Sequence, residues 1–375
     1  MKVMLTANAA WNIWNFRRPL VEALAGDGHM VTVLAPPDDA VPELERLGCR
    51  VRPLKMSVKG LNPLEDLKLQ RRFGRIFREE RPDAVLSYTI KNNIFGARAA
   101  KPAGVPFLPN VTGLGTAFLS GRLLQTLTEQ LYRRSFAVLP VVFFQNEDDR
   151  DLFLERRLVR SGQARLLPGS GIDLHHFAPA PMPAPGEPPV FLMIARLLRD
   201  KGVVEFVEAA RRVRARHPRA RFQLLGSVAS ENRTAIDHPT LEAWVAEGLV
   251  EYLGTTADVR PAIAASTCVV LPSYREGAPR TLIEAAAMAR PLIATEVPGC
   301  RAVVDRDQSG FLCEVRSAES LATAMERFLA LPQGAQQAMG AKGRAKMERE
   351  YDQALVVEAY RAALEVVAGG RRGTH

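Results

Sequence analysis

The sequence predicts an α/β fold made of two doubly wound, Rossmann-like domains. Short apolar runs rich in β-type residues alternate with longer amphipathic stretches along the whole chain, which is typical of parallel sheets covered by helices. The 375 residues also exceed what one hydrophobic core usually serves. Finally, the alternating pattern occurs twice, before and after a proline-rich segment at residues 178–189, which we interpret as a linker.

The first half contains five expected strands, and helices separate them. These strands are Val3–Thr6, Val31–Ala35, Ala84–Ser87, Pro106–Pro109 and Val141–Gln145. The expected helices are Pro19–Ala25, Leu64–Arg78, Ile94–Ala100 and Leu123–Phe136. Each helical stretch has the length and the apolar spacing of a helix that covers a sheet. We therefore predict a first domain over residues 1–170.

The second half repeats the pattern. Its expected strands are Val190–Ala195, Arg221–Leu225, Val250–Leu253, Val269–Pro272 and Leu292–Thr295. Its expected helices are Val203–Ala215, Leu241–Glu247 and Thr281–Met288. We predict a second domain over residues 171–350. Residues 351–375 are expected to form a last helix, Tyr351–Val367, that packs back towards the first domain, and a frayed tail. A ligand of such sheets binds beyond the carboxyl ends of the strands.

Composition and charge narrow the functional classes. Apolar residues make up 47% and charged residues 24%, which excludes an intrinsically disordered chain. Four scattered cysteines form no CxxC pair, and no zinc spacing is present. The chain lacks a secretory signal pattern and an apolar run of roughly 20 residues. We therefore expect a protein of the reducing cytosol.

The formal net charge of +9 has three interpretations. A solvated, arginine-rich surface is the simplest; an anionic membrane surface and nucleic acid are the others. We favour the membrane and expect no nucleic acid, because aromatic residues are not interleaved with the basic clusters as a stacking platform requires. The clusters are Arg17 and Arg18, Arg71, Arg72, Arg75 and Arg78, Arg133 and Arg134, and Arg156, Arg157 and Arg160.

The most informative segment is a strand, a polar turn and a helix at residues 270–285. Glu276 stands on the turn with Gly277 and Pro279, and Glu284 stands one turn into the helix that follows. Free backbone N–H groups and the positive end of a helix dipole at such a turn suit a phosphate or a polyhydroxylated ligand. The alternative is that Glu276 caps the helix and Glu284 is an ordinary surface residue.

The residues around this glutamate pair resemble a known sequence motif. The string PSYREGAPRTLIEAAAMARP at residues 272–291 resembles the donor-binding motif of retaining GT-B glycosyltransferases of family 4, two glutamates separated by seven residues. Further strings resemble the branch that builds bacterial capsule, O-antigen and glycoprotein oligosaccharides. They are TANAAWNIWNFRRPL, GHMVTVLAPPDD, SYTIKNNIFG, NVTGLGTAF, FFQNEDDRDLF, LLPGSGIDLHHF, ARLLRDKGVVEF and EVPGCRAVV.

The resemblance implies roles for particular residues of the second half. Glu276 would bind the hydroxyls of the donor sugar, and Glu284 would hold the ribose of a UDP-sugar. Arg196 and Lys201 would bind the donor diphosphate and stabilise it as it departs, forming the catalytic set with Glu276. The remaining donor-binding candidates are Gly277, Ala278, Pro279 and Arg280 on the turn, and Gly226, Leu253 and Gly254 on the nucleobase side.

Departure of a diphosphate generates negative charge, which either a metal ion or protein cations and N–H dipoles must meet. The chain has no Asp-x-Asp motif, and the pairs Asp38–Asp39 and Asp148–Asp149 are explained as helix-start acids. The resembled family also works without an essential metal. We therefore predict no metal and no cofactor, with the UDP-sugar serving as a substrate. Asp258 and Arg260 are alternative contacts to the base, although helix capping explains Asp258 equally well.

The first half is expected to bind the acceptor. Its candidate contacts are Asn8, Trp11, Asn15, Arg17, Lys91, Thr112 and Gly113. Trp11 and Trp14 suit a hydrophobic core as well as a sugar or lipid. Many family members carry a histidine where this chain has residues 87–93, SYTIKNN, so no catalytic base is assigned. A front-face retaining reaction, in which the leaving phosphate takes the acceptor's proton, depends mainly on positioning and electrostatics.

The branch resemblance implies a particular acceptor and location. The acceptor would be a saccharide linked to a polyprenyl diphosphate, and the donor sugar an N-acetylhexosamine or hexose. The protein would be cytoplasmic and peripherally attached to the inner face of the plasma membrane through Arg17, Arg18, Arg71, Arg72, Arg75 and Arg78. Two alternatives stay open: a UDP-sugar epimerase on the same scaffold, and a basic membrane-binding or nucleic-acid-binding protein without catalysis.

Overall fold

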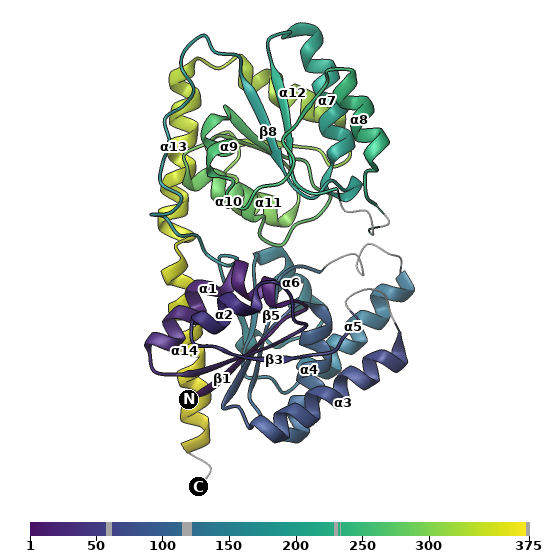
Figure 1. Ribbon diagram of the computed structural model, residues 1–375, viewed down its shortest axis with the longest axis vertical. Helices are drawn as coiled ribbons and strands as arrows, with labels where there is room; N and C mark the ends of the chain where they lie inside the picture. The colour runs from purple at the N-terminus through teal and green to yellow at the C-terminus, as the bar shows by residue number, and fades with distance from the viewer. Residues whose placement is uncertain (58–61, 115–121, 229–231, 233, 373–375) are drawn as a thin grey trace. The chain divides into compact units, whose positions relative to one another are not determined.

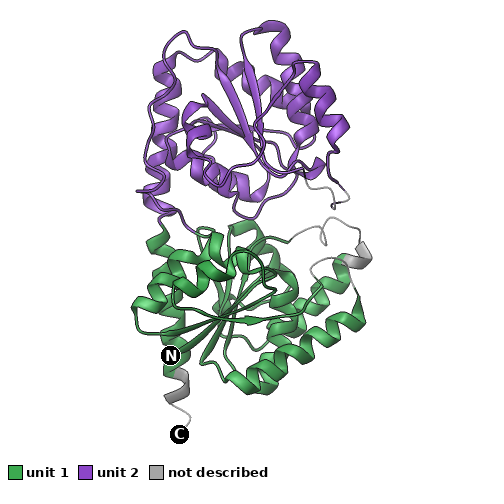
Figure 2. Ribbon diagram, viewed as in Figure 1, with its two compact units in different colours: residues 1–170, 353–375 green, residues 171–352 purple. Residues whose placement is uncertain are grey.

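The computed structural model describes residues 1–57, 62–114, 122–228, 232 and 234–372. The chain divides into two compact units, shown in Figure 2: unit 1 comprises residues 1–170 and 353–375, and unit 2 comprises residues 171–352. Each unit is a parallel sheet with helices packed against it (Figure 1). The prediction of an α/β fold with two doubly wound domains is therefore confirmed.

The sheet of unit 1 has the strand order β3-β2-β1-β4-β5-β6-β7. The strands are β1 Lys2–Thr6, β2 Met30–Ala35, β3 Arg50–Pro53, β4 Ala84–Tyr88, β5 Phe107–Val111, β6 Val142–Phe144 and β7 Ala164–Leu166. Thr6 pairs with Leu34 of β2 on one side and with Ser87 of β4 on the other. The order thus reverses between β1 and β4, which is the position where doubly wound sheets bind ligands.

The helices of unit 1 cover the faces of this sheet. They are α1 Ala10–Gly26, α2 Val41–Arg46, α3 Pro63–Glu80, α4 Ile90–Ala103, α5 Arg122–Phe136, α6 Glu147–Glu155 and α14 Gln353–Arg372, with the short 3₁₀ helix η2 at Ser161–Gln163. The start of α3 is fixed by the Asn62 side chain, which accepts hydrogen bonds from the N–H groups of Leu64 and Glu65, and by a proline at the first helical position.

Helix α14 belongs to unit 1 although it comes last in the chain. Its Tyr360 is fully buried, with its ring 4.8 Å from that of Phe143. The hydroxyl of Tyr360 accepts a hydrogen bond of 3.0 Å from the side-chain amide of Asn110 on β5. Val356, Leu364 and other apolar residues of the helix join the core that contains α1 and β1. Burial of this face fixes the helix against unit 1.

The sheet of unit 2 has the strand order β10-β9-β8-β11-β12-β13. The strands are β8 Val190–Ile194, β9 Arg221–Leu225, β10 Glu251–Tyr252, β11 Cys268–Leu271, β12 Leu292–Thr295 and β13 Gly310–Cys313. Here the order reverses between β8 and β11, whose residues Phe191 and Cys268 are paired. The segments that leave these two strands therefore meet at the switch point of the sheet.

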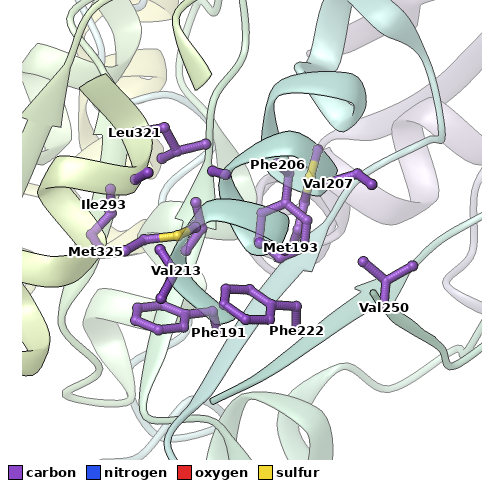
Figure 3. Close-up of a cluster of buried hydrophobic side chains, with 14 of the residues drawn as sticks. Phe191, Met193, Phe206, Val207, Val213, Phe222, Val250, Ile293, Leu321 and Met325 are labelled. Atoms are coloured by element: carbon purple, nitrogen blue, oxygen red, sulfur yellow. The ribbon is translucent and has the colours of Figure 1, made fainter. Parts of the chain in front are cut away.

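The helices of unit 2 are α7 Val203–Arg216, α8 His238–Ala246, α9 Arg260–Ala265, α10 Arg280–Ala287, α11 Pro298–Val303, α12 Ala318–Leu329 and α13 Gln333–Glu350, with the 3₁₀ helix η3 at Arg199–Lys201. Figure 3 shows the core beneath α7 and α12. The Phe191 and Phe222 rings of neighbouring strands stack at 5.4 Å, and Phe206 of α7 meets Phe222 edge-on at 6.0 Å. These aromatic contacts anchor α7 to the sheet.

Several sequence-based boundaries differ from the structure. The predictions omitted β3, β7 and β13, which are only three or four residues long and lie at the edges of their sheets. Helix α1 begins at Ala10 rather than at Pro19. Its first N–H groups are satisfied by remote acceptors, because Ala10 N donates to Pro36 O and Trp11 N donates to the Asp38 carboxylate. Such partners are invisible in the local pattern.

The proline-rich segment at residues 178–189 is not the connection between the units. It lies within unit 2, and the chain passes between units at residues 170–171 and 352–353. The buried Arg290 side chain holds the segment, because it donates hydrogen bonds to the carbonyls of Ala180 and Pro181. The same guanidinium also binds the carbonyls of Ile263 and Ala264. A charged group that satisfies four carbonyls attaches the segment firmly to α9.

Candidate active site

Two loops meet at the switch point of the unit 2 sheet, and each carries predicted donor-site residues. The segment after β8 contains Arg196 and Lys201, and the segment after β11 contains Glu276. Their backbones touch: a Cβ atom on Gly202 would lie only 2.1 Å from the Pro272 carbonyl oxygen. Gly202 also has φ +77°, a conformation that other residues rarely adopt. Glycine at this position therefore permits the close approach of the two loops.

The structure brings Lys201 and Glu276 together. Lys201 Nζ donates to Glu276 Oε1 at 2.5 Å, and 26% of the lysine side chain and 12% of the glutamate side chain are exposed. Residues 75 positions apart thus form one ion pair that is partly withdrawn from water, where its attraction exceeds that of a surface pair. Glu276 does not cap α10, because the residue before that helix is Pro279 and no side chain caps it.

Glu284 is a buried residue on α10 and not a surface residue. It is 8% exposed, and Arg280 one turn earlier donates from Nε to its Oε1 at 2.6 Å. Burial raises the pKa of the Glu284 carboxyl, and the neighbouring Arg280 opposes that effect. The start of α10 is held to the sheet by Thr281, whose hydroxyl donates to the Ile194 carbonyl at the end of β8.

The turn between Glu276 and α10 is enclosed from the side of α11. Gly299 N donates to the Glu276 carbonyl at 3.2 Å. A Cβ atom on Gly299 would lie 2.5 Å from Gly277 O and 2.7 Å from Glu276 O. The Thr295 hydroxyl of β12 binds the Ser273 carbonyl on the same loop. Gly277, Ala278 and Pro279 therefore form a turn whose path is fixed by its neighbours, and sequence reasoning did not single out Gly299.

The glycines expected near a nucleobase also lie at this edge. Gly226 N donates to Gly254 O at 2.8 Å, and the Tyr252 hydroxyl donates to Gly226 O at 3.0 Å. A Cβ atom on Gly226 would lie 2.0 Å from Ala195 O, next to Arg196. The loops after β8, β9 and β10 are thus contiguous. Leu253 is 41% exposed beside them, so an apolar side chain is available to a planar ligand.

Arg196 and the Asp258–Arg260 pair complete the surroundings. Arg196 is exposed at the end of β8. Asp258 accepts from Nε and Nη2 of Arg260 at 2.8 and 2.7 Å, and these hydrogen bonds lower the pKa of Asp258 to about 2. Arg260 N also donates to Asp258 at the start of α9. Asp258 is nevertheless not the cap of α9, because Val259 occupies the N-cap position and no side chain caps it; Asp258 contacts the first N–H of the helix from one residue earlier.

The acceptor-side candidates of unit 1 gather around the β1–β4 switch point. Asn92 of α4 donates to the Thr6 hydroxyl at 2.9 Å and faces the Thr89 hydroxyl, also at 2.9 Å. Thr89 has φ +71°, which costs energy for a non-glycine residue and is often found at functional sites. Lys91 pairs with Asp66 of α3 at 3.0 Å, and both side chains are largely buried. Sequence reasoning missed Thr6 and Asp66.

Arg17 is buried and cannot take part in a membrane-facing basic surface, so that expectation was wrong. It is 4% exposed, and its guanidinium carbon lies 4.3 Å from the centre of the Tyr88 ring. The apolar spacing of α1 turns this position towards the sheet. Nε and Nη1 find no hydrogen-bond acceptor among the described residues. Arg17 remains an acceptor-side candidate, as a buried cation that lies against the Tyr88 ring.

The other acceptor-side candidates are more exposed. Trp11 is 53% exposed at the first turn of α1, with its ring 5.5 Å from that of Phe16, whereas Trp14 packs against the core. Asn8 and Asn15 are partly buried on either side of that turn. Thr112 and Gly113 follow β5. Residues 115–118 of the motif that begins at Asn110 lie outside the described residues.

Nothing in the described ranges gathers three His, Cys, Asp or Glu side chains closely enough to hold a metal ion. All four cysteines are buried as free thiols. Burial raises the pKa of Cys49 to about 11, so this thiol stays protonated and unreactive at neutral pH. Among the helices that the structure describes, none is long and apolar enough to cross a membrane.

Comparison with known proteins decides the family. The model described as "Glycosyl transferase 4-like domain" matches residues 13–170, and the model "Glycosyl transferases group 1" matches residues 188–330. The two matches fall in unit 1 and unit 2, respectively, and together they cover most of the chain. The protein is a GT-B glycosyltransferase.

Individual relatives support this assignment, and one of them matches over nearly the full length. The transferase is 27% identical over 377 residues to the N,N'-diacetylbacillosaminyl-diphospho-undecaprenol alpha-1,3-N-acetylgalactosaminyltransferase of Campylobacter jejuni, covering 96% of this chain and 97% of the relative. It is 26% identical to the Escherichia coli UDP-Gal:alpha-D-GlcNAc-diphosphoundecaprenol alpha-1,3-galactosyltransferase, covering 72% of each chain.

Solved structures agree on the fold. Anabaena HepE, solved in complex with UDP, matches the transferase with a TM-score of 0.76 at 17% identity, covering 98% of this chain and 100% of the other. The sucrose-phosphate synthase of Thermosynechococcus elongatus matches with a TM-score of 0.79 at 20% identity over the same shares. The GT-B architecture predicted from the sequence is thereby confirmed.

Proposed function

We propose that the transferase moves a hexose or N-acetylhexosamine from a UDP-sugar to a saccharide linked to a polyprenyl diphosphate, with retention of the anomeric configuration. The observation that carries the proposal is two ion pairs, Lys201–Glu276 and Arg280–Glu284. Both are formed by residues that follow the carboxyl ends of β8 and β11. A nucleotide sugar offers phosphate oxygens and hydroxyls, which need cations and carboxylates respectively. The relatives' names point to the same acceptor class.

Within this site each residue has a defined task. Glu276 accepts hydrogen bonds from the donor sugar, and Glu284 accepts them from the ribose. Lys201 and Arg196 bind the diphosphate, and their charge stabilises the leaving group as its bond to the sugar breaks. The fixed turn of Gly277, Ala278, Pro279 and Arg280 places backbone N–H groups beside it. Gly226, Leu253 and Gly254 receive the uracil ring.

On the acceptor side, the buried cations of unit 1 suit a diphosphate. Lys91 already has Asp66 as its partner, whereas Arg17 has its charge enclosed without a carboxylate within 4.0 Å in the described residues. Asn8, Trp11, Asn15, Thr112 and Gly113 surround the same sheet edge and would contact the acceptor saccharide. Retention by a front-face mechanism needs no separate base, because the leaving phosphate takes the acceptor proton.

Attachment to an anionic bilayer surface is part of the proposal. Helix α3 carries exposed Leu64 and Leu67, 71% and 44% accessible, and exposed Arg71, Arg75 and Arg78. A helix with exposed leucines and arginines suits a peripheral membrane contact. Replacing the three arginines by glutamine is expected to abolish sedimentation with phosphatidylglycerol vesicles and to leave the protein folded. Unchanged sedimentation would exclude this surface.

The test of the function is a panel of UDP-sugars assayed with polyprenyl-diphosphate-linked acceptors, and with the product anomer determined by NMR. Glu276→Ala and Lys201→Ala are expected to lose at least about 100-fold in transfer. Glu326→Ala is the matched control, because it breaks an exposed ion pair with Arg216 elsewhere in unit 2. Full activity of either site variant would refute the assignment, and UDP release that ignores the lipid acceptor would favour another reaction.

We expect transfer to persist in a metal chelator, because protein cations replace a metal ion in this proposal. Loss of transfer with EDTA, restored by a divalent cation, would contradict it.

A further inference from the structure

The ion pair of Lys201 with Glu276 depends on how two separate loops are held together, and one side chain spans both. Tyr274 lies two residues before Glu276 on the loop after β11. Its backbone N–H donates to the Asp200 carbonyl at 2.9 Å, directly beside Lys201. Its hydroxyl donates to Glu205 Oε1 at 2.7 Å on the first turn of α7. Tyr274 thus bonds to the chain on both sides of Lys201.

The partner carboxylate depends on this tyrosine. Glu205 Oε2 is buried without a hydrogen-bond partner in the described residues, so the Tyr274 hydroxyl is the contact that satisfies the group. Burial, together with the hydrogen bond and the charge of Glu205, raises the pKa of Tyr274 to about 12. The phenol therefore stays protonated and remains a donor at any physiological pH.

The ring of Tyr274 is also held from a third segment. The Arg316 guanidinium, on the turn after β13, lies 4.6 Å from the ring centre. Asp200, whose carbonyl binds the Tyr274 N–H, also accepts a hydrogen bond from the Thr234 hydroxyl at 3.2 Å. The tyrosine is therefore restrained by its backbone, its hydroxyl and its ring face, as a residue that sets the distance between two loops should be.

We propose that Tyr274 is a positioning residue for the donor diphosphate, and that it acts through Lys201 without touching the nucleotide. The proposal rests on the proposed function, which places the diphosphate on Lys201. Loss of the hydroxyl frees the first turn of α7 from the loop after β11. Lys201 then samples positions away from the diphosphate, and Glu276 loses its fixed partner. Sequence reasoning passed over Tyr274 because an aromatic residue after a buried strand is usually core.

The test compares two nucleotides by isothermal titration calorimetry on the full chain. UDP has the second phosphate that Lys201 would bind, and UMP lacks it. Tyr274→Phe is expected to weaken UDP binding on the order of ten-fold and to leave UMP binding within about two-fold. A residue that merely supports the fold would change both affinities together.

Two variants make the result specific. Tyr351→Phe is the matched control, because it removes a buried tyrosine hydroxyl that donates to the Ala302 carbonyl at 2.9 Å. It should leave unchanged the ratio of the association constant for UDP to that for UMP, called the UDP/UMP ratio below. Lys201→Met should lower that ratio, and adding Tyr274→Phe to it should lower it no further.

The outcomes separate the two proposals. If Lys201→Met lowers the UDP/UMP ratio and Tyr274→Phe does not, the positioning role is wrong while the donor site stands. The same conclusion follows if the two substitutions add independently. If neither substitution changes the ratio, the diphosphate is not on Lys201, and both the site assignment and the positioning role fail.

Discussion

Gly299 provides the sharpest test of whether the position of the turn at residues 277–279, called the donor turn below, matters for the proposed function. This residue lies in α11, and a Cβ atom there would stand 2.5 Å from the Gly277 carbonyl oxygen and 2.7 Å from that of Glu276. Ordinary contact begins at 3.4 Å. Gly299→Ala therefore requires the Gly277 carbonyl to retreat from 2.5 to 3.4 Å, a shift of about 0.9 Å. Both carbonyls are backbone atoms, so the turn itself has to move.

The expected consequence is a catalytic defect larger than the structural one. A misplacement of about 1 Å at a positioning element costs on the order of 100-fold in rate, whereas overpacking of this kind costs about 1–3 kcal/mol of stability. We therefore expect Gly299→Ala to fold, with a lowered urea midpoint, and to lose on the order of 100-fold in kcat/KM for the UDP-sugar. The assay is initial-rate transfer, normalised to the folded fraction.

Two other glycines of unit 2 serve as controls. A Cβ atom on Gly340 would lie 2.1 Å from the Ala289 carbonyl oxygen, away from the donor turn. Gly340→Ala should therefore lose stability but keep its activity per folded molecule. A Cβ atom on Gly334 would meet nothing within 4 Å, so Gly334→Ala should be neutral or slightly stabilising. If Gly299→Ala and Gly340→Ala lose the same fraction of activity, the turn is not positioned as argued.

Two further predictions concern charged groups. Burial raises the pKa of Glu284 above its usual 4.5, so the carboxylate takes up a proton at a higher pH than an ordinary glutamate. The affinity for UDP should therefore fall as the pH drops through that raised pKa. The same measurement of UDP affinity against pH on Glu284→Gln should lack this step. Arg290→Met leaves the carbonyls of Ala180, Pro181, Ile263 and Ala264 without their donor, so urea unfolding should show a loss of at least about 3 kcal/mol at unchanged activity per folded molecule. Unchanged stability of Arg290→Met would contradict the argument that the Arg290 hydrogen bonds hold the proline-rich segment in place.

The sequence predicts the fold well where apolar runs are long. The central strands β1, β2, β8 and β9 are buried along most of their length. A strand of this kind is a nearly continuous apolar run in the sequence and can be predicted from that run. Strand β3 is only four residues, with two arginines and a proline at the sheet edge, so no apolar run marks it. A local pattern therefore reveals the middle of a sheet better than its edges.

The candidate site shows a similar division. The types and spacing of Glu276 and Glu284 were sufficient to propose a ligand turn, because their chemistry is local to one strand–turn–helix unit. The contact of Lys201 with Glu276 depends on strand order, which places β8 beside β11. Tyr274 and Gly299 are set against residues remote in sequence. From the sequence alone, the first is read as a core aromatic and the second as a flexible turn.

The proposed donor site also explains why its acids and bases are paired before any ligand is bound. A buried charge without a partner costs several kcal/mol, so an open site lined by free Glu276, Glu284 and Lys201 would be poorly tolerated. The pairs Lys201–Glu276 and Arg280–Glu284 remove that cost. In the proposed function a nucleotide sugar exchanges partners with this pair: its phosphate would bind Lys201, and its sugar hydroxyls would donate to Glu276. In this proposal every charged group has a partner with and without the nucleotide sugar. UDP alone still gains the contact with Lys201, but it leaves Glu276 without a partner, so the site is expected to bind a UDP-sugar more tightly than UDP.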